Sequence, residues 1–199
     1  YYKAAEASHY ENPTAIEFID MDSFLEAYRA KAGRPETRWE QATVSYTAMN
    51  SLLNSSSEHY YSVFSELKQW AGSNGRKIRL RDKAGKDIVL PPFLELTEAD
   101  LDPVELYAYY LGLYINNMRS GIYMDYILSF PVTYEKVERA KILQSFERGL
   151  RKSLPETILN NKDTMAQVRV RAGASEPAAY AVCALTEYGF EPEEAEKIF

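Results

Sequence analysis

Apolar positions in the second half of the chain follow an alternating order of helical and strand periods. Residues 103–118, 134–152 and 176–188 place apolar side chains three or four positions apart, which predicts helices. Residues 125–131 and 168–172 are short apolar runs, which predict strands. The order helix, strand, helix, strand, helix predicts an α/β unit whose two strands are parallel.

The first half of the chain is less regular. Residues 14–19 alternate as a short strand does, and Asp22 is expected to cap a helix over residues 23–31. A stripe of apolar side chains predicts a second helix over residues 55–71. Alternating apolar and charged positions around a glycine-containing loop predict a β-hairpin over residues 77–90.

Helix-start signals near Leu96 to Asp102 place a boundary between two parts of the chain. Residues 1–96 are expected to form an outer subdomain of helices and the hairpin, and residues 97–199 a core subdomain. The fold class expected from these elements is α/β or α+β.

The composition of the chain excludes some classes of partner and some kinds of site. The chain has 199 residues, 23 Lys and Arg, 29 Asp and Glu, and a net charge of −6. This acidic balance argues against nucleic acid as a partner, because phosphate backbones are bound by clustered cations. One cysteine and two histidines cannot make a zinc site, and the cysteine usage is typical of a cytoplasmic protein.

Motifs for phosphate binding and membrane insertion are absent from the sequence. No two of the nine glycines have the spacing of a dinucleotide fingerprint or of a P-loop. No apolar run is long enough to span a bilayer, so a membrane partner is not expected. Without an initiator Met or a signal peptide, the chain is interpreted as a piece of a longer soluble protein.

Candidate chemistry concentrates near the second predicted strand. Glu176 precedes Pro177 where a helix is expected to follow that strand, and ligand sites of α/β folds lie at such positions. Capping of the helix by Glu176 is the simpler explanation. Arg169 and Arg171 leave the same face of the strand, which therefore lies at an edge or pairs them with acids.

Four motifs follow one another in the order and spacing of a known family. They are Pro103-Val-Glu-Leu106, Ser129-Phe-Pro-Val-Thr-Tyr134, Glu138-Arg-Ala-Lys141 and Ser175-Glu-Pro-Ala-Ala-Tyr180. Residues 97–189 thus resemble the nucleotide-binding domain of the seventy-kilodalton heat-shock chaperones, in the actin-like ATPase superfamily. Upstream, Phe64-Ser-Glu-Leu-Lys-Gln-Trp-Ala-Gly72 is similar to the family segment that carries the catalytic lysine.

This resemblance implies an incomplete actin-like ATPase lobe and assigns roles to four residues. Lys68 stands where the family has its catalytic lysine, which stabilises charge on the γ-phosphate. Glu176 would contact a magnesium-bound water and help to orient the attacking water. Pro131 and Arg139 match the proline and arginine that carry the nucleotide state between the lobes.

Both phosphate loops of the family are missing from this sequence. The resemblance therefore implies ATP and magnesium as cofactors of the intact parent, with no tight binding of either to this chain alone. The missing lobe of the same domain is the expected partner, and a protein client is a second one. The parent is expected to be an ATPase, and the chain alone to be inactive.

Two alternatives stay open. The chain is alternatively a non-catalytic protein-interaction module, in which the aromatic N-terminal region docks another protein and the actin-like elements are only a scaffold. The other alternative is a lobe of a sugar or metabolite kinase of the same superfamily, although no substrate-binding acid for it is found in the sequence.

Overall fold

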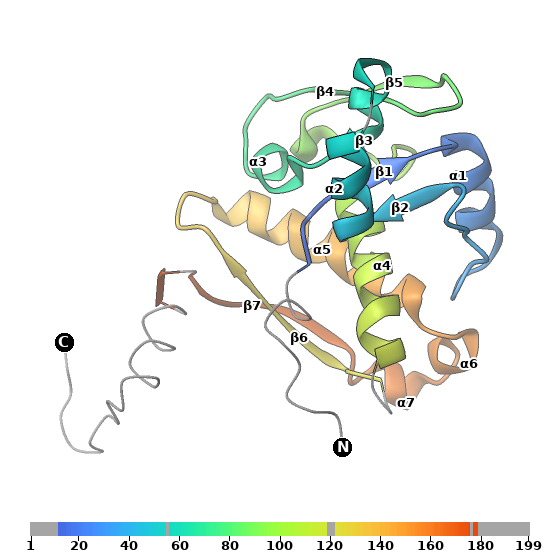
Figure 1. Cartoon of the computed structure of the whole chain (residues 1–199). Coiled ribbons are helices and arrows are strands. Elements are labelled where there is room, and N and C mark those ends of the chain that lie inside the picture. Colours follow the sequence, from blue (N-terminus) through green and yellow to red (C-terminus); the bar gives the residue numbers. More distant parts are fainter. Residues whose placement is uncertain (1–11, 55, 119–121, 176, 179–199) are drawn as a thin grey trace, which may run out of the picture.

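Two long helices and a pair of parallel strands form the second half of the molecule (Figure 1). The structure is a computed structural model and describes residues 12–54, 56–118, 122–175 and 177–178. Strands β6 (Asp125–Phe130) and β7 (Arg169–Ser175) pair in parallel, with Asp125 opposite Arg169. Helix α5 (Lys136–Ser153) connects them, so the predicted parallel unit is confirmed.

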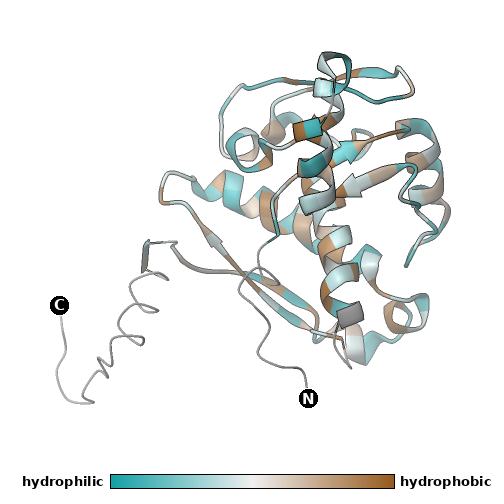
Figure 2. Ribbon diagram, in the orientation of Figure 1, coloured by the Kyte–Doolittle hydropathy of each residue, from teal (hydrophilic) through white to brown (hydrophobic). Residues whose placement is uncertain are grey.

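Helix α4 (Pro103–Met118) packs against α5 at very short range. At Gly149 an added Cβ would lie 2.0 Å from the carbonyl oxygen of Glu105, so only glycine lets the helices come this close. Polar positions alternate with apolar ones along α5 in Figure 2, as expected of a helix with one buried face. The predicted helices over 103–118 and 134–152 are thus confirmed.

Arg169 and Arg171 lie exposed on β7. The Arg171 guanidinium forms an ion pair with Asp125 on the neighbouring strand, at 3.0 Å. The expectation that the charges of this strand are paired or at an edge is therefore confirmed. Two short helices that the periodicity did not predict, α6 (Glu156–Leu159) and α7 (Lys162–Met165), precede this strand.

The first half of the molecule is built on a small antiparallel sheet. Its strands are β1 (Ile16–Phe18), β2 (Ala42–Val44) and β3 (Val63–Phe64), in the order β2-β1-β3. Helices α1 (Met21–Ala30) and α2 (Ser45–Asn54) follow β1 and β2. Strands β4 (Ile78–Arg81) and β5 (Asp87–Leu90) form the predicted hairpin, which is confirmed.

Two expectations for this half need correction, and two elements were not predicted. The α1 cap is Asp20, whose side chain accepts a hydrogen bond from the Ser23 N–H at 3.0 Å, and Asp22 lies inside the helix. The single helix over 55–71 is wrong, because β3 pairs there with β1. A 3-10 helix, η2 (Ser57–Ser62), precedes β3, and helix α3 (Leu67–Ala71) follows it. Strand β2 and helix α2 were missed, since their pattern is mixed.

One cluster of buried side chains includes residues from both sides of the predicted boundary at 96–102. Phe24 and Trp70 from the first half belong to the same cluster as Tyr109, Phe130 and Ile142. A 3-10 turn, η3 (Phe93–Glu95), links the halves. The fold is a mixture of helices and small sheets, which fits the α+β form of the expected class. The division into 1–96 and 97–199 stays a prediction.

None of the helices in the described part of the chain combines the length and the low polarity that crossing a bilayer requires.

Candidate functional site

Lys68 lies on the outer side of α3. Leu67, Trp70 and Ala71 are spaced three and four residues apart and are at most 4% exposed, so they hold this short helix against the core. The Lys68 side chain therefore extends into solvent. Within the described ranges no acidic side chain forms an ion pair with it.

Pro131 ends strand β6. Proline has no N–H to donate and cannot extend the ladder of strand hydrogen bonds. The backbone N–H of Tyr134 donates to the Pro131 carbonyl at 3.2 Å, which closes the turn between β6 and α5. Pro131 thus lies at the carboxyl end of a parallel strand, where α/β units place ligand sites.

Arg139 lies in the first turn of helix α5. Its side chain points back to the connection between β6 and α5. Its Nε donates to the Tyr134 carbonyl oxygen at 2.7 Å. The start of the helix is fixed by a capping box, in which Glu138 accepts from the Glu135 N–H at 2.6 Å. Arg139 is therefore held relative to Pro131 by hydrogen bonds through Tyr134.

Tyr134 also reaches α3. Its hydroxyl donates to the Lys68 carbonyl oxygen at 2.5 Å, across 66 positions of the chain. Its ring lies against Gly72, where an added Cβ would be 2.2 Å from the ring. Gly72 is needed for this close approach and not for its backbone angles, since its φ is −98°.

Three of the four residues singled out in the sequence therefore meet at one residue, Tyr134. Lys68, Pro131 and Arg139 each exchange a hydrogen bond with Tyr134 through at least one backbone atom. Tyr134 itself was not predicted. A tyrosine three positions after a proline that ends a strand is only a weak sequence signal for a functional residue. The contact of Tyr134 with Lys68 depends on tertiary packing.

Glu176, the fourth residue, lies outside the described residues. The structure follows β7 as far as Ser175 and describes Pro177 and Ala178 as helical. The helix expected over 176–188 falls mostly outside the described ranges. The role of Glu176 stays a prediction.

A cavity of about 180 Å³ lies between α3, α4, α5 and the end of β6. Lys68, Pro131 and Tyr134 line it. Most of the remaining wall is apolar and comes from four elements, with side chains that include Leu67, Val104, Leu128, Ile142 and Phe146. Lys68 is the only charged residue among those that line the cavity in the described structure.

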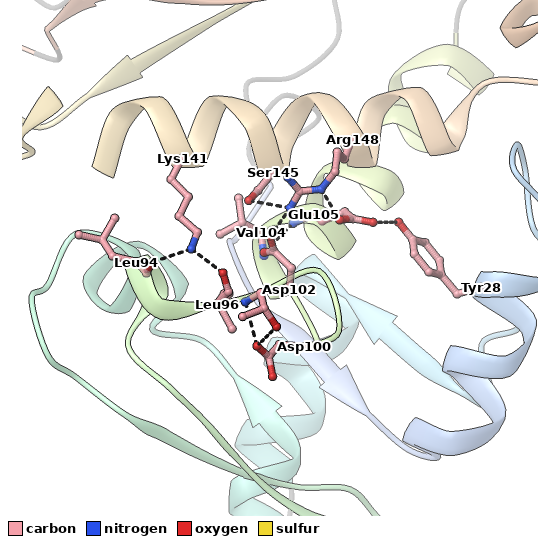
Figure 3. Close-up of polar contacts among 11 residues, drawn as sticks. Tyr28, Leu94, Leu96, Asp100, Asp102, Val104, Glu105, Lys141, Ser145 and Arg148 are labelled. Atoms are coloured by element: carbon pink, nitrogen blue, oxygen red, sulfur yellow. Dashed lines mark hydrogen bonds and ion pairs between the residues drawn. The ribbon is translucent and has the colours of Figure 1, made fainter. Parts of the chain in front are cut away.

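A second cluster of polar contacts lies further along α5 (Figure 3). Arg148 forms ion pairs with Asp102 and Glu105 at the start of α4, both at 2.9 Å. Glu105 also accepts a hydrogen bond from the Tyr28 hydroxyl of α1 at 2.9 Å. Nearby, Lys141 donates to the carbonyl oxygens of Leu94 and Leu96, each at 2.8 Å.

Asp102 has two tasks in this cluster. It caps α4 by accepting from the Val104 N–H at 2.9 Å, which agrees with the helix-start signal in the sequence. It is also only 8% exposed, and this burial raises the pKa of its carboxyl group although Arg148 opposes the shift. The contact with Arg148 depends on how α4 and α5 pack and has no sequence signal.

The resemblance implies ATP and magnesium as cofactors, and the described residues fit these two differently. The exposed Lys68 ammonium beside the cavity can offer one positive charge to a phosphate group. Among the residues that the structure describes, no group of three or more His, Cys, Asp or Glu side chains could hold a metal ion. The described residues thus fit a phosphate contact but not a magnesium site.

No protein-family model matches the chain, and a search of curated proteins finds no relative.

Proposed function

We propose that this chain is part of the first lobe of a chaperone-like ATPase domain of the actin-like superfamily. In this proposal Lys68 places its positive charge beside the γ-phosphate, where negative charge develops during phosphoryl transfer. Glu176 helps to orient the attacking water. The rest of the site, which includes the phosphate loops and the metal ligands, comes from the missing lobe and other parts of the parent.

The observation that carries this proposal is the set of contacts around Tyr134. The resemblance assigned Lys68, Pro131 and Arg139 from two segments that are more than 60 positions apart in the sequence. The Tyr134 hydroxyl, N–H and carbonyl contact these three residues, one each. Such an arrangement supports a path by which a change at the Pro131 turn reaches the lysine.

Two further features support the proposal. The parallel unit of β6, α5 and β7 has the connection that α/β nucleotide-binding lobes use. The Lys68 side chain is exposed and without an acidic partner in the described ranges, so its charge is available to a ligand.

The test is ATP turnover by the intact parent protein. Lys68→Ala is expected to lower the turnover number about a hundredfold, as loss of one preorganised charge does in other enzymes. Lys77→Ala is the matched control, because Lys77 is an exposed lysine that does not line the cavity. Glu176→Gln is expected to lower turnover as well. Wild-type rates in both Lys68→Ala and Glu176→Gln would overturn the proposal.

The chain alone is expected to show no saturable ATP binding at micromolar concentrations. The phosphate loops are not in this sequence, and backbone N–H groups of such loops hold the phosphates. Isothermal titration of the 199-residue chain with ATP measures this directly. Binding with a defined stoichiometry would contradict the assignment of the missing loops to other segments.

A second candidate function is a non-catalytic protein-interaction module. It is favoured by large apolar side chains exposed on the first half of the molecule, among them Trp39, Tyr46, Leu53, Tyr60 and Tyr61. The parent gene distinguishes the candidates. An Asp-x-Gly-Thr turn upstream and a Gly-Gly-Gly hairpin downstream favour the ATPase, and their loss favours the module.

A further inference from the structure

The cavity beside Lys68 is mostly apolar, and two of the hydroxyl groups that line it already donate hydrogen bonds elsewhere. The Tyr134 hydroxyl donates to the Lys68 carbonyl, and the Tyr107 hydroxyl donates to the Asn12 carbonyl at 2.9 Å. A buried water needs two to four polar partners, and these two hydroxyls have no further hydrogen to donate to it. The interior of the cavity therefore favours an apolar occupant over water.

The size of the cavity selects a small occupant. Its volume is about 180 Å³. A dry cavity of about 150 Å³ lined by leucine, isoleucine and phenylalanine is large enough to bind benzene. The cavity beside Lys68 can therefore accept one six-membered aromatic ring.

The charge at the cavity selects among such rings. Lys68 is the only charged residue of the described lining, and its side chain is exposed. A ligand that carries a carboxylate can pair with this ammonium group while its ring remains among apolar side chains. A cationic group at the same place would be repelled.

We propose that this cavity is a binding site for small carboxylic acids with a single aromatic ring, held at the rim by Lys68. The inference does not rest on the ATPase proposal, because it concerns binding by the chain itself. Its failure would leave the prediction for ATP turnover untouched.

Benzoate, benzamide and benzamidine test the site, because they share one flat shape and carry negative, neutral and positive charge. Each is titrated into the 199-residue chain with methyl-labelled leucine, isoleucine and valine, and chemical shifts are followed by NMR. Benzoate is expected to bind with a millimolar dissociation constant, as fragment-sized ligands do. Shifts are expected at the Leu67, Leu128 and Ile142 methyls and not at Val89, which is exposed and does not line the cavity.

Benzoate is expected to bind about fivefold more tightly than benzamide, the size of effect that a partly exposed ion pair supplies. Benzamidine is expected to bind most weakly. Lys68→Met should remove this order while benzamide binds within about twofold of its original affinity. Lys77→Met, a change at an exposed lysine away from the cavity, should preserve the order.

A variant that fills the cavity tests the location. Ala71 lines the cavity and is 3% exposed, so Ala71→Leu should weaken all three ligands. If this variant does not fold, the methyl shifts of the wild type and the Lys68→Met comparison still decide. The proposal is overturned if benzoate causes no shifts at the three cavity methyls up to about 10 mM. It is also overturned if Lys68→Met leaves the charge order unchanged.

Discussion

Two of the junctions between the α5 region and the first part of the chain differ in their chemistry. At the hydroxyl junction, near the start of α5, Tyr134 contacts Lys68 and Gly72 of the α3 segment. At the charged junction, further along α5, side chains of both signs are joined in one network, which consists of Tyr28, Asp102, Glu105 and Arg148. The first junction depends on one neutral hydroxyl and the second on ion pairs.

The spaces beside the two junctions differ in the same way. The hollow beside Arg148 has a volume of about 610 Å³ and is lined partly by charged side chains, among them Glu98, Lys136 and Lys141. The cavity beside Tyr134 is smaller and apolar apart from Lys68 and a few polar groups. Water solvates a hollow with charged walls well, whereas an apolar cavity is better filled by an apolar group. The small-molecule site that we propose therefore lies at the hydroxyl junction.

The largest difference is expected in the free energy of unfolding when Gly149 and Gly72 are each replaced by alanine. An added Cβ at Gly149 would meet backbone, 2.0 Å from the Glu105 carbonyl oxygen, whereas at Gly72 it would meet the Tyr134 ring. Backbone of a packed helix cannot move easily, but the ring can shift into the adjoining cavity. Gly149→Ala should lower the free energy of unfolding by about 2 kcal/mol, since overpacking of about 3 is offset by about 1 from helix propensity.

Gly72→Ala should cost less than about 1 kcal/mol. Urea denaturation of both variants measures the difference, and each variant serves as the control for the other. Equal losses at the two sites would mean that the cavity gives the Tyr134 ring no room to move.

The next largest effect is expected at Arg148. Arg148→Met leaves the buried Asp102 carboxylate without its cationic partner. Because Arg148 is itself about half exposed, the loss should be about 1.5 kcal/mol and not the full cost of breaking a buried pair. Arg151→Met is the matched control, because among the described residues Arg151 forms its ion pair with the equally exposed Glu147 one turn earlier. The control should lose less than about 0.5 kcal/mol in the same urea experiment.

Removal of one hydroxyl at each junction separates stability from function. Tyr134→Phe removes the hydroxyl that donates to Lys68, and Tyr28→Phe removes the hydroxyl that donates to Glu105. Each change should cost about 1 kcal/mol of stability. Only Tyr134→Phe should also lower ATP turnover by the parent, through kcat and with KM unchanged, because only Tyr134 positions Lys68. A similar loss of turnover in both variants would show a general effect of stability.

The smallest effect is expected in the pH dependence. Burial raises the pKa of Asp102 in the folded state above its unfolded value near 3.8. The folded protein then binds more protons between the two values, so the cost of the buried charge is fully present above the folded pKa and disappears as the pH falls toward 3.8. Asp102→Asn should remove this dependence, so the stability of the wild type relative to the variant should rise on acidification. Urea denaturation across that range measures it, and a constant difference would contradict the sign.

Local patterns were sufficient wherever an element is determined by its own residues. The hairpin over 77–90, the helix that became α5 and the parallel strands follow from periodicity and from short turns. Local patterns were insufficient for β3, because Val63 and Phe64 form a strand only by pairing with β1. The apolar stripe over 55–71 does contain buried side chains, which are Phe64, Leu67 and Trp70. The stripe is nevertheless divided among three elements, η2, β3 and α3.

In the candidate site, too, some features could be predicted from the sequence and others depend on tertiary packing. The sequence singled out Lys68, Pro131, Arg139 and Glu176 as residues to test through the resemblance to a known family, whose motif order and spacing can be compared along the chain. Only the tertiary structure placed the first three around Tyr134, since the hydroxyl of Tyr134 meets Lys68 after α3 packs against the turn that follows β6. It alone also formed the apolar cavity and the Arg148 network, because spaces and charge pairs between helices arise from packing and have no local pattern.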